Sequence, residues 1–173
     1  MSSRTPNREH IRNVMLANKS KDTSPELELR KALRDSGLTG YRIHNKKLPG
    51  KPDACFIGKK VAVFVNGCFW HRCPYCKPSM PKSNVDFWES KFKRNKERDK
   101  ENRMDLLSMG FRVFTIWECQ IKRKDYSIIR DVREALQVNN TNGMDRGGCS
   151  IYTIRGDVHK TCGEDQAQEE NHS

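Results

Sequence analysis

This 173-residue sequence contains no long hydrophobic run. No apolar stretch approaches the roughly 20 residues that a membrane-spanning helix requires, so we expect no membrane partner. The first residues, Met1 to Arg8, also lack the apolar segment of a secretory signal. Both absences favour a cytoplasmic protein, and the length suits one domain with a hydrophobic core.

Acidic residues are scarce over most of the chain. The net charge is +11, and residues 139–173 hold three basic against six acidic residues, so the first 138 residues carry +14. A domain this basic commonly faces a polyanion, with nucleic acid the leading candidate and a solubilising surface the alternative. We predict a basic N-terminal arm at residues 1–20, a folded domain at 21–138, and a polar, acidic, mobile extension at 139–173. The arm is either a disordered terminus or a segment that follows DNA phosphates.

Three of the seven cysteines stand too close together for a disulfide framework. In a chain without a secretory signal, thiols are expected to bind metal or to stay free. Cys68-x4-Cys73-x2-Cys76, together with the distant Cys119, supplies four thiolates, which is the ligand set of a closed structural Zn²⁺ site. The alternative is a group of buried free thiols.

The reactive side chains follow an apolar, β-branched run, Val61–Val65, which is typical of a buried strand. A second strand is expected just before it, over residues 53–57, with a hairpin turn at Gly58–Lys60 between the two. Asp53 stands at the start of that strand, where nucleases of the PD-(D/E)xK type present their first metal-binding carboxylate. The Pro-Asp dipeptide alone says little, because it occurs in many turns.

Helices are expected before and after these strands in the sequence. Residues 24–37 predict a helix that is capped by Ser24 and ended by Gly37. Glu26 lies in its first turn, where the helix dipole alone accounts for a carboxylate. Residues 86–109 predict one long amphipathic helix or two, basic in character and ended by Gly110, whose charged face either contacts phosphates or is simply solvated. The other expected elements are short strands at 41–44 and 151–154, a strand at 111–117 and a closing helix at 126–138.

The residues among the cysteines have more than one interpretation. Phe69 and Trp70 lie between metal ligands, so we expect them to be pinned and exposed, either capping the core or entering a DNA base stack. Trp88 joins them or packs in the core. His71 is the only histidine expected at the site. It could replace a zinc ligand or act as a general base, and the supply of four cysteines favours the base.

Six motifs occur in a fixed order along the chain: Lys21-Asp-Thr-Ser-Pro-Glu26, Leu48-Pro-Gly-Lys-Pro-Asp53, Val63-Phe-Val-Asn-Gly-Cys-Phe-Trp-His71, Phe87-Trp88, Glu97-Arg-Asp99 and Phe111-Arg-Val-Phe-Thr-Ile-Trp-Glu-Cys119. This order resembles that of the very short patch repair (Vsr) DNA mismatch endonucleases, over roughly residues 8–137. The resemblance implies a restriction-endonuclease-like α/β fold, with a central mixed sheet flanked by helices. It also implies an enzyme that nicks DNA 5′ to the thymine of a G:T mismatch, which arises where 5-methylcytosine deaminates.

The resemblance further implies roles for particular residues. Asp53 and the backbone carbonyl of Val65 would hold Mg²⁺, His71 would activate the attacking water, and Glu26 would assist the water shell of the metal. Asp99 falls where the family keeps an acidic residue near the site. The implied DNA-contacting aromatics are Phe69, Trp70 and Trp88, and the implied ligands of a structural zinc are Cys68, Cys73, Cys76 and Cys119. The partners implied are mismatched duplex DNA and a MutL-type repair protein, for a monomer in the prokaryotic nucleoid.

Two departures from the family pattern stand out. Asn66 occupies a position where family members often carry a second histidine, and the zinc loop is richer in cysteine than in histidine. Two other functions stay open: an endonuclease of the same fold that cleaves a matched recognition sequence, and a non-catalytic zinc module that binds damaged DNA. The aromatic residues argue against the first, and the presence of both Asp53 and His71 argues against the second.

Overall fold

The computed structural model describes residues 21–137 and the strands at 151–154 and 157–160, so the predicted N-terminal arm lies outside the described residues. In chain order the elements are α2 (Ser24–Asp35), β1 (Ala54–Phe56), the 3₁₀ turn η1 (Ile57–Lys59), β2 (Val61–Asn66), α3 (Val85–Ser108), β3 (Arg112–Trp117), α4 (Glu118–Lys122), α5 (Ser127–Gln137), β4 (Ile151–Ile154) and β5 (Asp157–Lys160). Within this part of the chain, no helix is long and apolar enough to cross a membrane.

The central sheet has three strands in the order β1-β2-β3. β1 runs antiparallel to β2, with Ala54 opposite Val63, whereas β2 and β3 are parallel, with Val65 opposite Ile116. Parallel neighbours need a long crossover, which α3 provides. The predicted mixed α/β architecture is therefore confirmed, and its assignment to the restriction-endonuclease-like fold stays a prediction.

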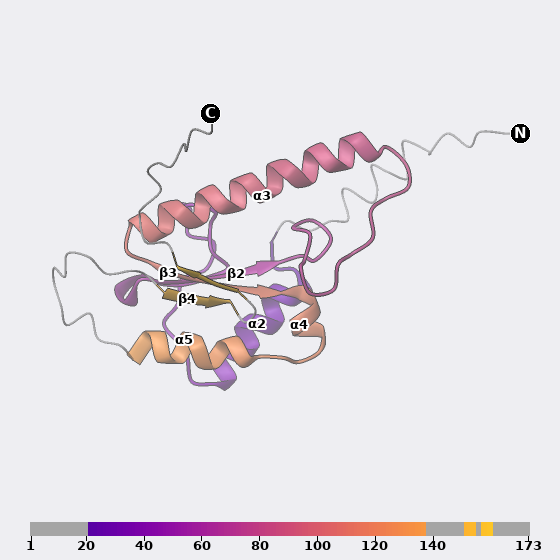
Figure 1. Cartoon of the computed structure of the whole chain (residues 1–173). Coiled ribbons are helices and arrows are strands. Elements are labelled where there is room, and N and C mark those ends of the chain that lie inside the picture. The colour runs from indigo at the N-terminus through magenta and orange to yellow at the C-terminus, as the bar shows by residue number, and fades with distance from the viewer. Residues whose placement is uncertain (1–20, 138–150, 155–156, 161–173) are drawn as a thin grey trace, which may run out of the picture.

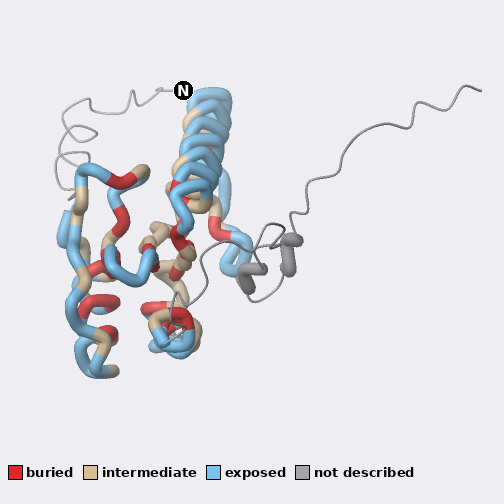
Figure 2. Tube along the Cα trace, turned by 90° about the vertical axis from the view of Figure 1, so that its left-hand side faces the viewer, coloured by how far each residue is buried: buried red, intermediate tan, exposed pale blue. Residues whose placement is uncertain are grey.

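Helices cover both faces of the sheet, α3 on one side and α2, α4 and α5 on the other (Figure 1). Val61 and Val63 of β2 point into the core beneath α2 and α5, where they pack with Leu29 and Val132. The alternate residue Ala62 points to the opposite face, into a smaller core beneath α3. Figure 2 shows burial concentrated between the helices, while α3 is exposed along most of its 24 residues, a length of about 36 Å.

Glycines end α2 and α3 in the same way, as the sequence predicts. After α2, Gly37 adopts a left-handed conformation (φ 74°), and the Leu38 amide donates to the carbonyl of Leu33 at 2.9 Å. After α3, Gly110 (φ 79°) is followed by Phe111, whose amide reaches back into the helix in the same pattern. This is the Schellman motif, which satisfies the last carbonyls and anchors an apolar residue beyond the helix. The chain is thereby directed back to the sheet at both points.

Three local predictions need correction, and a fourth is confirmed. The cap of α2 is Thr23 rather than Ser24, because the helix begins one residue earlier than expected. Residues 41–44 form a single bridge, Arg42 with Cys55, instead of a strand. The link between β1 and β2 is a 3₁₀ turn with Lys60 in the left-handed region, not a plain hairpin turn. The predicted strand at 151–154 is confirmed, and it pairs with β5 in a separate two-stranded sheet.

Candidate active site and four-cysteine cluster

The β1–β2 ladder is open at the end where Asp53 lies. Val65 donates its amide to Asp53 Oδ2 at 2.7 Å, so the backbone of Val65 faces β1. In an antiparallel ladder the N–H and the C=O of such a residue point to the same neighbour. Continuing the register from the Ala54–Val63 pair places Pro52 opposite Val65. Proline has no N–H, so it cannot satisfy the Val65 carbonyl, which stays available beside the Asp53 carboxylate.

The electrostatics of Asp53 suit a bound cation. Burial raises the pKa of its carboxyl to about 6, the amide of Val65 opposes this rise, and the negative charge of Glu26 adds to it. A carboxylate that is costly to ionise gains when a divalent cation lies against it. Carboxylate and carbonyl oxygens are also the donors that Mg²⁺ prefers. Asp53 and Val65 therefore fit the predicted Mg²⁺ site, and their role in holding it stays a prediction.

Glu26 is buried at the start of α2, and both of its carboxylate oxygens are engaged. Oε1 accepts from the Thr23 hydroxyl at 2.8 Å, while Oε2 accepts from the Asp22 amide at 2.9 Å. The Arg30 guanidinium also donates to Oε2 at 3.2 Å and to Asp22 Oδ1 at 2.5 Å, which lowers the pKa of Asp22. This supports the helix-start role of Glu26, and its assistance to a metal remains a prediction.

The sequence interpretation missed His44. Its Nε2 lies 3.1 Å from Arg30 Nη2 and 3.4 Å from Asp22 Oδ1, and it is one of the groups that oppose the rise in the pKa of Asp53. His44 is therefore a second histidine near the candidate metal residues, besides the predicted His71. No periodicity marks His44, because it belongs to an irregular loop and has a left-handed backbone (φ 48°). Only the folded chain brings it to α2.

His71 and Asp99 come together on the other face of the sheet. The Asp99 carboxylate is hydrogen-bonded to His71 Nδ1, which joins α3 to the loop after β2. Both residues line a hollow of about 310 Å³ beneath α3, which we call the α3 hollow and which Asn66 also lines. Asn66 thus stands beside the histidine, in the α3 hollow.

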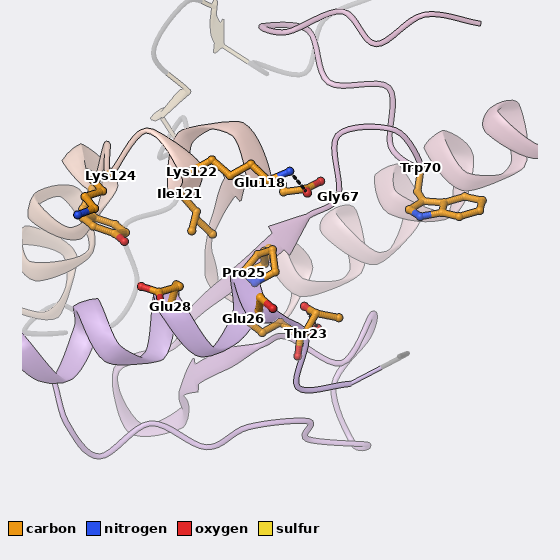
Figure 3. Close-up of a pocket in the computed structure, with 13 residues that line it drawn as sticks. Thr23, Pro25, Glu26, Glu28, Gly67, Trp70, Glu118, Ile121, Lys122 and Lys124 are labelled. Atoms are coloured by element: carbon orange, nitrogen blue, oxygen red, sulfur yellow. Dashed lines mark hydrogen bonds and ion pairs between the residues drawn. The ribbon is translucent and has the colours of Figure 1, made fainter. Parts of the chain in front are cut away.

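A second hollow, of about 780 Å³, opens between α2 and α4 and is called here the α2–α4 hollow. Glu26 and Val65 line it, and Trp70 lies at one end (Figure 3). Val65 and Asn66 are consecutive in β2, so their side chains point to opposite faces. Among residues 21–137, no hydrogen bond or ion pair joins Asp53 to His71. The predicted site therefore consists of two groups of residues, Glu26 with Asp53 and Val65 on one face of the sheet and His71 with Asp99 on the other. The two groups approach each other at the C-terminal end of β2.

The four predicted zinc ligands converge. One sulfur atom from each of Cys68, Cys73, Cys76 and Cys119 lies within 4.8 Å of the other three. The sulfurs of Cys73 and Cys119 are 3.7 Å apart, close to the edge of about 3.8 Å that a tetrahedron with Zn–S bonds of about 2.3 Å would have. The Cys119 amide also donates to the Cys68 sulfur at 3.3 Å. The cluster is therefore compatible with a structural zinc, and it needs no histidine.

The predicted DNA-contacting aromatics form one cluster, but they are not fully exposed. The ring of Phe69 lies 5.1 Å from that of Trp70, 5.4 Å from that of Trp88 and 5.3 Å from that of Phe92. Phe69, Trp70 and Trp88 are half-buried, and Phe92 is buried. The expectation of exposed rings is wrong because α3 supplies partners that cover them. Phe87, half exposed at the edge, stacks edge-on against Trp88.

Comparison with known proteins defines the class, which is that of DNA-nicking endonucleases. The family model described as DNA mismatch endonuclease Vsr matches residues 5–77. The type II nicking enzyme V.NmeAIP of Neisseria meningitidis serogroup A is 40% identical over 129 residues, covering 71% of this chain and 91% of that protein. The DNA mismatch endonuclease Vsr of Escherichia coli K12 is 32% identical over 111 residues, which cover 64% of this chain and 70% of that protein. The chain belongs to the Vsr DNA mismatch endonuclease family.

Proposed function

We propose that this protein nicks one strand of duplex DNA 5′ to the thymine of a G:T mismatch, by Mg²⁺-dependent hydrolysis, in very short patch repair. The observation that carries the proposal is the composition of the α2–α4 hollow. It brings Trp70, from the aromatic cluster, into one cavity with Glu26 and Val65, from the candidate metal site. A ring that enters the base stack there would stand next to the phosphate to be cleaved.

A mismatched pair is the natural target of such an arrangement. Unstacking a base step costs a few kcal/mol, and it costs least where pairing is already poor. The clustered rings of Phe69, Trp70 and Trp88 offer a large apolar surface for the opened step. Lys91 holds its ammonium 5.1 Å from the centre of the Trp70 ring, which adds positive charge beside the cluster. Selectivity for G:T would thus follow from the lower cost of opening.

The side chains at the end of β2 can carry out hydrolysis. When bound, Mg²⁺ supplies positive charge that stabilises the negative charge developing on the phosphate oxygens. Asp53 and Val65 would hold it. His71 would accept the proton of the attacking water at Nε2, while Asp99 orients the ring through Nδ1. The water oxygen bonds to phosphorus, one phosphoester bond breaks, and the departing oxygen is protonated from solvent.

A second candidate is a nicking endonuclease that acts on a matched recognition sequence. Several relatives are named type II nicking enzymes, among them V.XorIIP of Xanthomonas oryzae, 37% identical over 113 residues, which cover 65% of this chain and 82% of that protein. The names of these nicking enzymes do not mention a mismatch. The two candidates therefore differ in substrate and share the chemistry.

A nicking assay separates them. Two strand-labelled duplexes that differ only in one G:T or G:C pair are incubated with Mg²⁺ or with EDTA, in several flanking contexts. Mg²⁺-dependent nicking of the thymine strand in the G:T duplex alone supports the proposal. Equal nicking of both duplexes would favour the matched-sequence enzyme. Binding without cleavage in every context would indicate a non-catalytic DNA-binding module.

A further inference from the structure

The end of the α2–α4 hollow away from Trp70 carries charges of both signs, with Lys124 and Glu28 lining it from opposite sides. Three consecutive basic residues, Lys122, Arg123 and Lys124, lie at the end of α4 and in the turn after it, and both lysines line the hollow. Figure 3 shows Trp70 at one end, Lys124 at the other, and Glu26 and Lys122 between them from opposite sides. No part of the predicted active site accounts for these lysines.

Lys122 is held in place by a chain of contacts from the cysteine loop. Its ammonium lies 2.6 Å from Glu118 Oε1, and the other oxygen of Glu118 accepts the Cys68 amide at 3.3 Å. Glu118 is therefore a positioning residue that ties α4 to the loop after β2. The Lys122 side chain is 71% exposed, so its remaining N–H groups face solvent, where an outside anion can reach them.

Lys124 is placed by an unusual backbone. Its φ is 56°, in the left-handed region that residues with a side chain rarely adopt, and its amide donates to the carbonyl of Ile121 at 2.9 Å. The Asp125 amide also donates to the carbonyl of Gln120 at 2.9 Å, so α4 ends in the same Schellman motif as α2 and α3, and this motif fixes where the Lys124 side chain begins. Among the described residues, the ammonium of Lys124 makes no ion pair, so its charge is free for an outside anion.

We propose that Lys122 and Lys124 bind a phosphate of the nicked strand, one that neighbours the phosphate to be cleaved. This inference rests on the proposed function, because it takes the hollow to be the path of that strand. Aromatic rings followed by a line of positive charge are how proteins bind a DNA strand. Along this hollow the strand would meet the ring of Trp70, then the backbone of Val65, and then the two ammonium groups.

The salt dependence of binding tests the phosphate contact. Binding of a G:T duplex is measured by fluorescence anisotropy with Ca²⁺ in place of Mg²⁺, for the wild type and for Lys124→Ala and Lys122→Ala. Lys31→Ala is the matched control, since Lys31 is exposed on α2 and pairs only with Asp35. Each loss of a phosphate contact should lower the slope of log K against log salt by about 0.9. The ratio of the wild-type binding constant to that of each variant should then fall about 3.5-fold between about 50 and about 200 mM salt.

Replacing single phosphates with an uncharged analogue identifies which phosphate the two lysines contact. Single methylphosphonates are placed along the nicked strand, one per duplex. We expect one position near the nick to weaken binding by the wild type several-fold and to have no effect on the double variant Lys122→Ala/Lys124→Ala. This non-additivity indicates direct contact. If the double variant keeps the wild-type slope and the wild-type methylphosphonate pattern, as Lys31→Ala should, the inference is wrong. The proposed function is unaffected by that result as long as the wild type nicks the G:T duplex. If the wild type nicks no duplex, the proposed function fails first.

Discussion

Asp99, on the outer helix α3, is hydrogen-bonded to Nδ1 of His71, in the loop that follows the central strand β2. Both side chains are partly buried, with 30% and 20% of their surface exposed, so the contact is shielded from bulk water. A carboxylate at Nδ1 keeps the proton on that nitrogen and leaves Nε2 as the acceptor. The pair therefore has the form of a base and the residue that orients it.

We expect Asp99→Asn to slow nicking by about 10- to 1,000-fold without weakening DNA binding. The amide can present its N–H to the ring and so favour the wrong tautomer, as happens when an orienting aspartate is replaced. His71→Ala should lower the rate by about 100- to 10,000-fold. Single-turnover nicking, measured beside anisotropy binding, separates the two effects. Asp105→Asn, an exposed change on the same helix, is the control, and an equal loss in that variant would assign the effect to α3 as a whole.

Asp53→Asn should abolish nicking, preserve DNA binding and stabilise the metal-free protein. The folded protein holds the Asp53 proton up to a pKa of about 6, whereas an unfolded chain releases it near about 3.9. Ionising Asp53 therefore costs stability, and the cost grows as the pH rises from about 4 to about 6 and is complete above it. Its removal should raise the free energy of unfolding at pH 7.5 by about 1–3 kcal/mol. Urea unfolding without added Mg²⁺ at pH 7.5 and pH 4 tests this, since the gain should vanish at the lower pH.

The acid limb of the nicking rate should depend on the concentration of Mg²⁺. A proton and the cation compete for the Asp53 carboxylate, so more Mg²⁺ should move the midpoint of the limb below about 6. Glu26, Arg30 and His44 share this environment and shift the midpoint without abolishing the competition. Rates are measured from pH 5 to pH 8 at several Mg²⁺ concentrations. A midpoint that stays fixed would place the titrating group elsewhere, at His71 for instance.

Features that depend on residues close together in the sequence could be predicted, whereas contacts between distant segments could not. The strand Val61–Val65 and the glycine ends of both long helices follow from patterns within a few residues, and they are confirmed. The cysteines were found because metal-ligand spacing is itself a local signal. The burial of Trp70 was missed because its partners come from α3, and His44 was missed because a loop delivers it to α2. The division of the site between two faces of β2 likewise depends on which helix covers each face.

Cys73→Ser should reduce the zinc content and lower the melting temperature. The four sulfurs join the loop from residue 68 to residue 76 to the start of α4, so losing one ligand weakens this link. Zinc is measured by elemental analysis of the purified protein, and unfolding by circular dichroism. Cys55→Ala is the matched control, because Cys55 is buried in the core away from the cluster and its loss should cost stability with zinc unchanged. Wild-type zinc content in Cys73→Ser would show that the ligand set is wrong.

Trp70→Ala should reduce the preference for a G:T duplex over a G:C duplex. The ring lines the α2–α4 hollow together with Val65 and Glu26, as no other residue of the described aromatic cluster does. Stacking of a base on such a ring contributes about 1–3 kcal/mol, which corresponds to about a 5- to 150-fold loss in kcat/KM on the mismatch. Trp70→Phe keeps a ring and should retain most of the preference. A 2-aminopurine beside the mismatch reports unstacking, and its fluorescence should rise with the wild type and with Trp70→Phe, but not with Trp70→Ala. If Trp70→Ala still unstacks the base and keeps its preference for G:T, the cluster belongs to the core and mismatch selection lies elsewhere in the protein.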